Sequence, residues 1–543
     1  MQAPKPTSVG AESLSSCDDT PHEAPMATEL TKDRDVTEHG ARLVLITFGI
    51  IAATLMQTLD STIVNVALPT IQGNLGATQE QGAWVVTGYI ISAVIVIPLT
   101  PWLQTRFGRR QYYSVAIIGF TIASLLCGFA SSIDQLVFYR ILQGLFGGGL
   151  IATGQAALRD TFPRHLLGMS QAVFALGAIV GPSVGPTVGG WLTDNYSWNW
   201  VFFINIVPGI FAATVVLTMM RNPTDPKPIP VDALGLGLLA LGLGSLQYIL
   251  DEGQRNDWFD APIIRLLAFT TVAGLAAFIC WELWGTKRPI VDLRAFKHRA
   301  IAAGSALGFA IGSVLFGATV ILPQYVQSIL GFTATLSGEL IFIRAAFIAL
   351  LTPFIARLAG SGRVDTRLLL VTGFSLIGVS QIWLGYITTS QNDFNSLLGP
   401  AIMAGVGLAM LFVPIQIAVM SAVPQDVVPK AAAFQSLSLQ LGGSFSTAAL
   451  ITLLARRNAF HQSVLAQTAT PDNTALQILT QQTHSATAAL GNLYQLILQQ
   501  AGVMAYADAQ WALGALTFVL LPLVFVLPRR RKGAITPVEI PAE

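Results

Sequence analysis

The stretch LVLITFGIIAATLMQTLDSTIVNVALPTI, residues 43–71, is almost wholly apolar and carries a single acidic side chain, Asp60. A run of about twenty apolar residues is long enough to cross the hydrocarbon core of a bilayer as a helix. A charge at the centre of such a helix costs roughly 2.5 to 3.5 kcal/mol even on the insertion scale that gives the lowest values. We therefore expect Asp60 to face the interior of a helix bundle and to have a function there.

The rest of the chain repeats this apolar pattern. Its 543 residues are 53% hydrophobic and 11% charged, whereas soluble domains carry about 25% charged residues. The sequence therefore predicts an all-α polytopic membrane protein in contact with the lipid bilayer. The formal net charge of +1 argues against a nucleic-acid partner, because no basic face accumulates to attract phosphates. Fourteen transmembrane helices are predicted, at 43–67, 83–103, 112–130, 134–157, 168–192, 200–220, 233–250, 262–284, 300–322, 337–358, 368–388, 398–422, 431–455 and 508–527.

Lys and Arg concentrate in alternate loops, which is typical of loops retained in the cytoplasm. Both termini are therefore predicted to be cytoplasmic, in agreement with an even number of spans. The first forty residues lack the apolar core of a signal peptide, and Met26 is an alternative to Met1 as the start. The predicted order is a cytoplasmic tail at 1–41, a six-helix bundle at 42–221, a linker with two additional transmembrane helices at 222–299, a second six-helix bundle at 300–527 that includes a long periplasmic loop at 456–507, and a cytoplasmic basic tail at 528–543.

Two of the predicted spans carry distinctive motifs. In the fourth, RILQGLFGGG at 140–149 places Arg140 and Gln143 on one helix face with small residues. Arg140 either snorkels to an interface or has a function in the bundle, and its depth in the span favours a function. In the fifth span, glycines four residues apart alternate with prolines, which predicts close helix contact and a bend that matters to a conformational change. This motif comprises Gly177, Gly181, Pro182, Gly185, Pro186, Gly189 and Gly190.

Other polar residues within the spans are candidates for a substrate cavity. The tenth span carries Glu339 and Arg344 five residues apart, on different helix faces, so they are not expected to pair. Arg344 should face a cavity or a partner carboxylate, because exposure to lipid would be costly. A mostly apolar cavity with a few adaptable hydrogen-bonding groups suits bulky amphipathic or cationic compounds. The candidates are Gln57, Asn65, Gln143, Arg344, Gln416 and Gln440.

Several motifs together resemble the major facilitator superfamily, and more narrowly its fourteen-span drug:proton antiporters of the EmrB/QacA type. They are LDSTIVNVALPTI at 59–71, RFGRR at 106–110, RILQG at 140–144, GPxxGPxxGG at 181–190, GGWLTDNYSWNWVFFINIVPG at 189–209, LDEGQRNDWF at 250–259 and PIVDLRAFKHR at 289–299. The resemblance covers about residues 43–527. It implies two six-helix bundles with two extra central helices, a bacterial inner-membrane location, and a secondary transporter rather than an enzyme. It also implies a periplasmic adaptor that contacts the long loop, and an outer-membrane channel.

The loop after the second span departs from the pattern of this family. The family pattern in this loop is GxLaDrxGrr. This chain has Pro101 in place of the first Gly and Thr105 in place of the Asp, which puts the charge relay of that Asp in doubt. The motif residues that remain act as a cytoplasmic latch or only as orientation signals; they are Arg106, Gly108, Arg109 and Arg110.

These observations predict a proton-coupled exporter of drugs or other amphipathic toxic compounds. Burial disfavours the charged form of a carboxylate, so Asp60 is expected to bind and release H+ as its surroundings change, with Arg140 as its partner in one conformation. The proton gradient is the energy source, and no metal or other cofactor is expected, because the three cysteines lie far apart and the six histidines are scattered. The alternatives are an exporter of a metabolite, fatty acid or siderophore, a channel, or a membrane-embedded enzyme, although GxSxG, HExxH, P-loop and CxxC motifs are absent.

Overall fold

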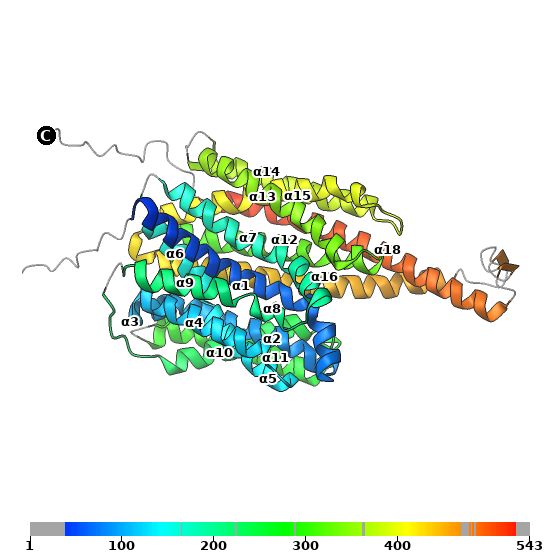
Figure 1. Ribbon diagram of the computed structural model, residues 1–543, viewed down its shortest axis with the longest axis horizontal. Coiled ribbons are helices and arrows are strands. Elements are labelled where there is room, and N and C mark those ends of the chain that lie inside the picture. Colours follow the sequence, from blue (N-terminus) through cyan, green and yellow to red (C-terminus); the bar gives the residue numbers. More distant parts are fainter. Residues whose placement is uncertain are drawn as a thin grey trace, which may run out of the picture.

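The computed structural model describes residues 38–163, 166–222, 225–286, 289–360, 364–467, 477–478, 481–482 and 485–527. In this part of the chain, thirteen helices are long and apolar enough to cross a membrane. The helix pair 169–182 and 184–195, bent by 42°, supplies a fourteenth span. The long helices run side by side along the longest axis of the molecule (Figure 1). The predicted all-α polytopic fold is thus confirmed.

The first half of the chain contains six spans, several of which are broken. Pro98 and Pro101 interrupt the second span with a 3-10 turn, because proline lacks an amide donor. Gly148 and Gly149 divide the fourth span into two helices. The elements are α1 (Gly40–Leu75), α2 (Gln79–Val96), η1 (Ile97–Leu99), α3 (Thr100–Phe107), α4 (Arg109–Gly128), α5 (Ile133–Gly147), α6 (Leu150–Thr161), α7 (Leu167–Asn195), α8 (Trp200–Phe203) and α9 (Ile206–Met219).

Two accessory helices and a second group of six spans follow. The accessory helices, α10 (Ala233–Glu252) and α11 (Pro262–Cys280), pack against each other, and α10 also contacts α2 and α16. Short turns lie beside them at η3 (Trp258–Asp260), η4 (Trp281–Gly285) and η5 (Leu293–Lys297). The remaining elements are α12 (Arg299–Ser328), α13 (Ala334–Gly360), α14 (Thr366–Ile387), α15 (Phe394–Ala422), η6 (Gln425–Val427), α16 (Val428–Gln467), α18 (Ala486–Leu520) and η7 (Leu521–Val526).

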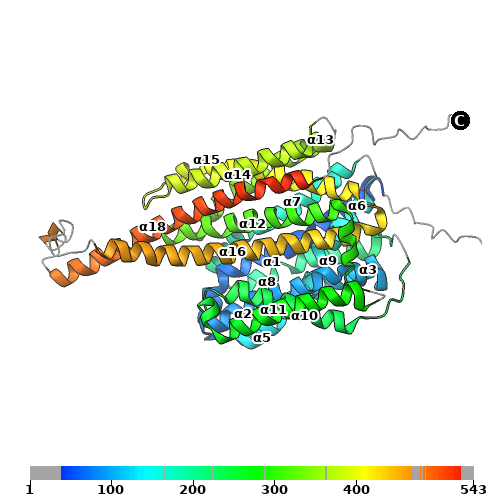
Figure 2. The ribbon, with the colours of Figure 1, turned by 180° about the vertical axis from the view of Figure 1, so that it is seen from behind.

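The predicted loop at 456–507 differs from the structure. We expect two spans that end at 455 and begin at 508, but α16 continues to Gln467 and α18 begins at Ala486. The two helices project together beyond the rest of the bundle (Figure 2). The stretch 456–467 has no Gly or Pro to end a helix and contains good helix formers such as Ala, Leu and Gln. Residues 456–467 and 486–507 therefore extend two membrane helices rather than belonging to a loop.

Both ends of the described chain lie at the same end of the bundle, which we call the termini end. Glu38 N donates to Thr161 O at the end of α6, 3.0 Å away. Arg367 Nε, at the start of α14, donates to Leu527 O at 3.1 Å. The opposite end, from which α16 and α18 project, is called the distal end. The predicted tails at 1–41 and 528–543 lie, except for residues 38–41, outside the described residues.

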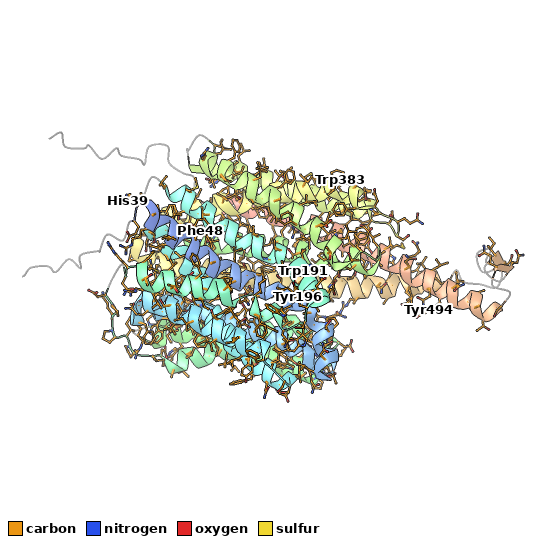
Figure 3. The ribbon with its side chains drawn as sticks, in the orientation of Figure 1. His39, Phe48, Trp191, Tyr196, Trp383 and Tyr494 are labelled. Carbon is orange, nitrogen blue, oxygen red and sulfur yellow. The ribbon has the colours of Figure 1, made fainter. Side chains whose placement is uncertain are left out.

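Large apolar side chains cover the outside of the bundle. Phe48, Trp191 and Trp383 are among them, and each is more than 40% exposed (Figure 3). Such a surface would be unfavourable in water and is suited to contact with lipid, while Trp and Tyr are enriched where lipid meets water. The outside of the bundle is therefore the lipid-facing surface of a multi-pass membrane protein.

A glycine seam joins α7 to α1. A Cβ atom on Gly181 would lie 1.9 Å from Thr58 Oγ1, and a Cβ on Gly185 would lie 2.2 Å from Thr62 Oγ1. These two threonines stand on either side of Asp60 in the chain. The other side of α7 meets the second half, where a Cβ on Gly338 of α13 would be 2.0 Å from Thr187 Oγ1. The bent helix α7 thus contacts both the segment that carries Asp60 and the opposite half of the protein.

The seam predicts different effects for two alanine substitutions. Gly181→Ala should destabilise the protein by about 1–3 kcal/mol, because the added methyl group overlaps Thr58. Gly177→Ala is the matched control, since its Cβ would lie 3.5 Å from Ile51, an ordinary contact. Thermal unfolding of the detergent-solubilised variants should show a lower midpoint for Gly181→Ala alone. Equal midpoints would contradict the proposed close contact.

Candidate functional site

Asp60 lies in a fully enclosed network of charged and amide side chains. Its side chain has no solvent exposure, and its Oδ2 accepts a hydrogen bond from Arg140 NH1 at 2.5 Å. Its Oδ1 accepts from Gln143 Nε2 and from Asn205 Nδ2, each at 2.9 Å. Both carboxylate oxygens are therefore occupied by donors from α5 and from the residue that precedes α9.

The Arg140 guanidinium is held by more than the carboxylate. Its Nε donates to Val85 O of α2 at 2.9 Å, and NH1 also donates to Gln143 Oε1 at 2.7 Å. The guanidinium carbon lies 4.1 Å from the centre of the Tyr89 ring, within the range of a cation–π contact. Arg140 therefore joins α1, α2 and α5 at one point in the interior of the first half.

This geometry links protonation of Asp60 to movement. A proton on the carboxylate would neutralise Asp60 and leave the buried Arg140 charge without compensation, since a guanidinium keeps its charge in proteins. Removing one partner of a buried ion pair typically costs about 3–5 kcal/mol. That cost favours a rearrangement that hydrates Arg140 or gives it another partner. The network can thus convert a proton-binding event into a change of helix packing.

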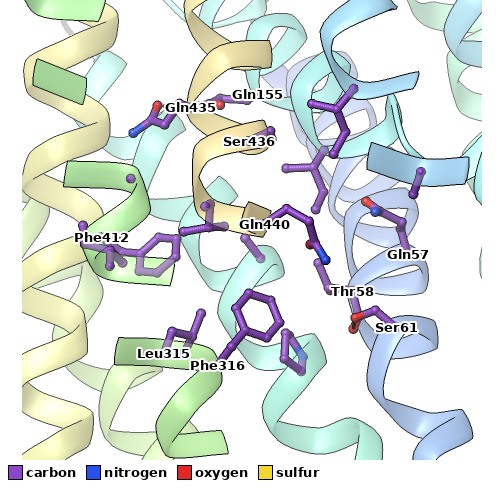
Figure 4. A pocket seen from close by; sticks show the side chains of 18 of the residues that line it. Gln57, Thr58, Ser61, Gln155, Leu315, Phe316, Phe412, Gln435, Ser436 and Gln440 are labelled. Atoms are coloured by element: carbon purple, nitrogen blue, oxygen red, sulfur yellow. Dashed lines mark hydrogen bonds between the residues drawn. The ribbon is translucent and has the colours of Figure 1, made fainter. Parts of the chain in front are cut away.

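Two adjoining cavities lie between the halves of the protein. The central cavity, about 60 Å³, is lined by α1, α2, α6, α7, α12, α15 and α16 (Figure 4). The distal cavity, about 570 Å³, extends from the middle of the bundle to the distal end. Ser61 and Gln440 line both cavities. Pockets for drug-sized ligands have volumes of about 300–1,000 Å³, so of these two cavities the distal one is large enough for such a ligand in this conformation.

The termini end of the interface is closed by polar contacts between the halves. Gln155 of α6 donates through Nε2 to Gln416 of α15 and, at 3.3 Å, to Gln435 Oε1 of α16. Arg159 of α6 donates through NH2 to Met420 O and Val423 O at 3.4 Å. These contacts lie between the central cavity and the termini end, so the two halves meet there and separate toward the distal end.

The structure separates the candidate cavity residues into two groups. Gln57, Gln416 and Gln440 line the central cavity, while Asn65 and Gln440 line the distal one. Gln143 lies instead in the Asp60 network, with no solvent exposure. Arg344 is 2% exposed, is outside the lining of both cavities, and donates through NH2 to Thr319 Oγ1 at 3.1 Å. Arg344 has no acidic partner in the described part of the chain.

The loop motif forms a second buried ion pair. Arg109 NH1 lies 2.5 Å from Asp160 Oδ2 at the end of α6, and Arg109 Nε donates to Gln104 Oε1 at 3.0 Å. Gly108 adopts a φ of +84°, which favours glycine, at the turn between α3 and α4. Arg106 and Arg110 lie outside this pair: Arg106 donates to Ile229 O, and Arg110 to Leu217 O. Asp160 is therefore the acidic partner of Arg109, the loop-motif residue in this ion pair.

Three residues of these networks were missed from the sequence. Asn205 lies in the resembling segment 189–209, where its amide gave no sign of a contact with Asp60. Asp160 could have been noticed as an acid among the basic loops of the termini end. Gln155 is one of many glutamines, and its role in closing the interface depends on the approach of α15 and α16. The first and third partnerships join residues more than 140 positions apart, which a local pattern does not reveal.

The fold and site are those of a multi-pass transporter with two helical halves and a charged centre. Residues 50–452 match the Major Facilitator Superfamily model, and the chain belongs to this family of secondary transporters, which are not enzymes. The multidrug export protein EmrB of Escherichia coli K12 is 35% identical over 491 residues, 90% of this chain and 95% of EmrB. The fatty acid resistance protein FarB of Neisseria gonorrhoeae is 34% identical over 495 residues, 90% of this chain and 96% of FarB.

Solved structures support the same fold at low sequence identity. The proton:xylose symporter XylE has a TM-score of 0.58 and 14% identity, with 90% of this chain and 96% of XylE covered. The human organic anion transporter MFSD10 has a TM-score of 0.56 and 11% identity, with 90% of this chain and all of that chain covered. The family model and the relatives confirm the predicted resemblance: the protein is a major facilitator transporter related to multidrug exporters of the EmrB type.

The Asp60 network predicts a specific pattern of stability. Asp60→Asn should lower the free energy of unfolding by about 3–5 kcal/mol, because it leaves Arg140 charged and buried. Asp60→Asn combined with Arg140→Gln removes both charges and should recover most of this loss. Thermal or denaturant unfolding of the purified variants measures the difference. If the double variant is less stable than Asp60→Asn, the unpaired charge is not the source of the destabilisation.

Proposed function

We propose that this protein is a proton-coupled antiporter that exports amphipathic compounds, including drugs, from the cytoplasm or inner leaflet by alternating access. The observation that carries the proposal is the buried ion pair between Asp60 and Arg140. Asp60 is a protonatable group in the transmembrane core. It lies close to a cavity between the two halves, because Gln57 and Ser61 on the same helix line the central cavity. Relationship to EmrB and FarB supports export of toxic amphipathic compounds.

The proposed cycle uses the ion pair as a switch. Asp60 gains a proton when the cavity is open to the outside, and the loss of its charge releases Arg140. The α7 seam carries the resulting shift to the second half, since α7 contacts α1 beside Asp60 and α13 across the interface. Asp60 releases the proton to the cytoplasm when the cavity opens inward. One charge crossing about 100 mV supplies roughly 2.3 kcal/mol, and a pH gradient adds to it.

With both termini in the cytoplasm, as the distribution of Lys and Arg predicts, the described conformation is outward-facing. The polar contacts of Gln155 and Arg159 then close the cytoplasmic side. The distal cavity then opens toward the periplasm, on the side where protons enter. In this state the Arg109–Asp160 pair lies at the cytoplasmic side, where it strengthens the closed end of the first half.

A second candidate is the export of a fatty acid by the same scaffold. Relationship to FarB, a fatty acid resistance protein, favours it. Both candidates use the same proton site, so they differ in the compound carried. Sensitivity profiles of a deletion strain against dyes, uncouplers, antibiotics and long-chain fatty acids would distinguish them.

Transport in inverted membrane vesicles tests the coupling. Asp60→Asn should lower gradient-driven export at least tenfold, because the variant cannot carry a proton at this position. Asp134→Asn is the matched control, since Asp134 is exposed in the first turn of α5. Collapse of the proton gradient upon addition of substrate, followed with a pH-sensitive dye, gives the rate. Normal coupling in Asp60→Asn at equal expression would exclude Asp60 as the proton carrier.

We also propose that the hairpin formed by α16 and α18 contacts a periplasmic adaptor, which links the transporter to an outer-membrane channel. Apolar side chains are exposed on the projecting helices: Phe460, Leu490 and Tyr494 are each at least 51% exposed. Figure 3 places Tyr494 on the projecting part, beyond the main body of the bundle. A group of exposed apolar side chains outside the lipid-facing surface is typical of a protein–protein contact.

Substitutions on the hairpin test the adaptor contact separately from transport. Leu490→Ser with Tyr494→Ser should abolish co-purification with an adaptor while export in vesicles is retained. Gln499→Ser, an exposed polar position on the same helix, is the matched control. Retention of the adaptor by the double variant, in amounts equal to those of the control, would refute this contact.

A further inference from the structure

The accessory helix α10 contributes a carboxylate to the wall of the distal cavity. Three charged residues line that cavity: Asp251, Glu252 and Arg255. Arg255 NH1 lies 3.3 Å from both carboxylate oxygens of Glu252, so these two charges compensate each other. Asp251 is therefore the charge on the cavity wall that lacks a cation among the described residues.

The contacts of Asp251 leave one oxygen available. Oδ1 accepts a hydrogen bond from Gln247 Nε2 at 2.9 Å, whereas Oδ2 is buried, accepts no hydrogen bond of standard geometry, and has the Thr87 hydroxyl as its polar neighbour. Gln247 Nε2 also donates to Ser444 Oγ of α16 at 3.0 Å, and Gln247 has no solvent exposure. An amide bridge between α10 and the second half thus holds the carboxylate in position, and no cation of the described residues pairs with its second oxygen.

The surroundings of Asp251 favour a cation with an apolar body. A carboxylate in a poorly hydrated cavity is stabilised by an opposite charge or by a proton. Asp251 lies in the last turn of α10, where the helix dipole also favours a positive charge nearby. Apolar and aromatic side chains such as Leu250 and Phe316 line the same cavity. Arg344 lies behind Thr319 of this wall and forms no ion pair with Asp251.

From this geometry we propose that Asp251 binds the cationic group of amphipathic substrates, such as an organic ammonium or phosphonium ion, in the distal cavity. The inference rests on the proposed export function and assigns a task to the accessory helices. A cation that leaves the central cavity can pass Gln440 and Ser61, which line both cavities, and reach Asp251. Neutral substrates use the same path without this contact. Asp251 thus determines specificity for charge, whereas Asp60 carries the proton for all substrates.

The test compares a permanent cation with a neutral compound. Asp251→Asn keeps an oxygen that can accept from Gln247 but removes the charge. We expect its rate of tetraphenylphosphonium export to fall at least tenfold in reconstituted proteoliposomes, while export of the neutral dye Nile red changes less than twofold. The matched control is Asp260→Asn, which removes an exposed acidic charge of η3 outside the cavity lining; both rates should stay within twofold of the wild type.

Binding to the purified full-length protein gives a second measurement. The Kd for tetraphenylphosphonium should rise at least tenfold in Asp251→Asn, and Asp251→Glu, which keeps the charge, should recover most of the affinity. Equal losses of cation and neutral export, or unchanged cation export and binding, would overturn the inference. In the second case, continued proton-driven export of Nile red would leave the proposed function intact. Failure of the wild type to export either compound would overturn both.

Discussion

The ion pair between Asp60 and Arg140 is the interaction on which the rest of the structure depends. Two opposite charges in the interior of a membrane protein are tolerated only when each has full compensation. Here Gln143, Asn205 and the Val85 carbonyl complete the hydrogen bonding of the pair. The packing of the first half is therefore stable while the pair is ionised. Protonation of Asp60 removes the charge that compensates Arg140 and so destabilises that packing.

The helices around this pair can pass its state to the interface. The glycines of α7 bring its backbone against α1 on both sides of Asp60, and α7 also contacts α13 of the second half. The polar contacts of Gln155 and Arg159 hold the halves together at the termini end, while the distal cavity separates them at the other. One end of the interface is thus closed while the other is open. Packed helices have a few discrete arrangements rather than a continuous range, so a conformational switch would exchange the closed and the open end.

The accessory helices add a second charged feature that is independent of the Asp60 network. α10 packs against α2 of the first half and α16 of the second, and Gln247 is the polar bridge to α16. This position puts Asp251 on the cavity wall rather than in the lipid. The segment LDEGQRNDWF at 250–259 is one of the motifs that carry the family resemblance. The sequence does not show that its acids Asp251 and Glu252 line a cavity. Burial of Arg344 with one hydroxyl partner is a further feature that sequence position alone did not explain.

By itself, the sequence determined that this is an all-helical membrane protein, and it predicted that the acid at position 60 faces the interior of the bundle, where the structure places it. Hydropathy and the cost of a buried charge are sufficient for that, since both are properties of a single helix. Helix ends were less predictable from hydropathy. The helices α16 and α18 continue beyond the predicted membrane spans, because the polar residues that follow also favour helix. Only the tertiary structure decided which groups meet Asp60, where Gln143 and Arg344 lie, and that Asp251 faces a cavity. These relations depend on helix rotation and on contacts between distant segments, which hydropathy and motif spacing do not specify.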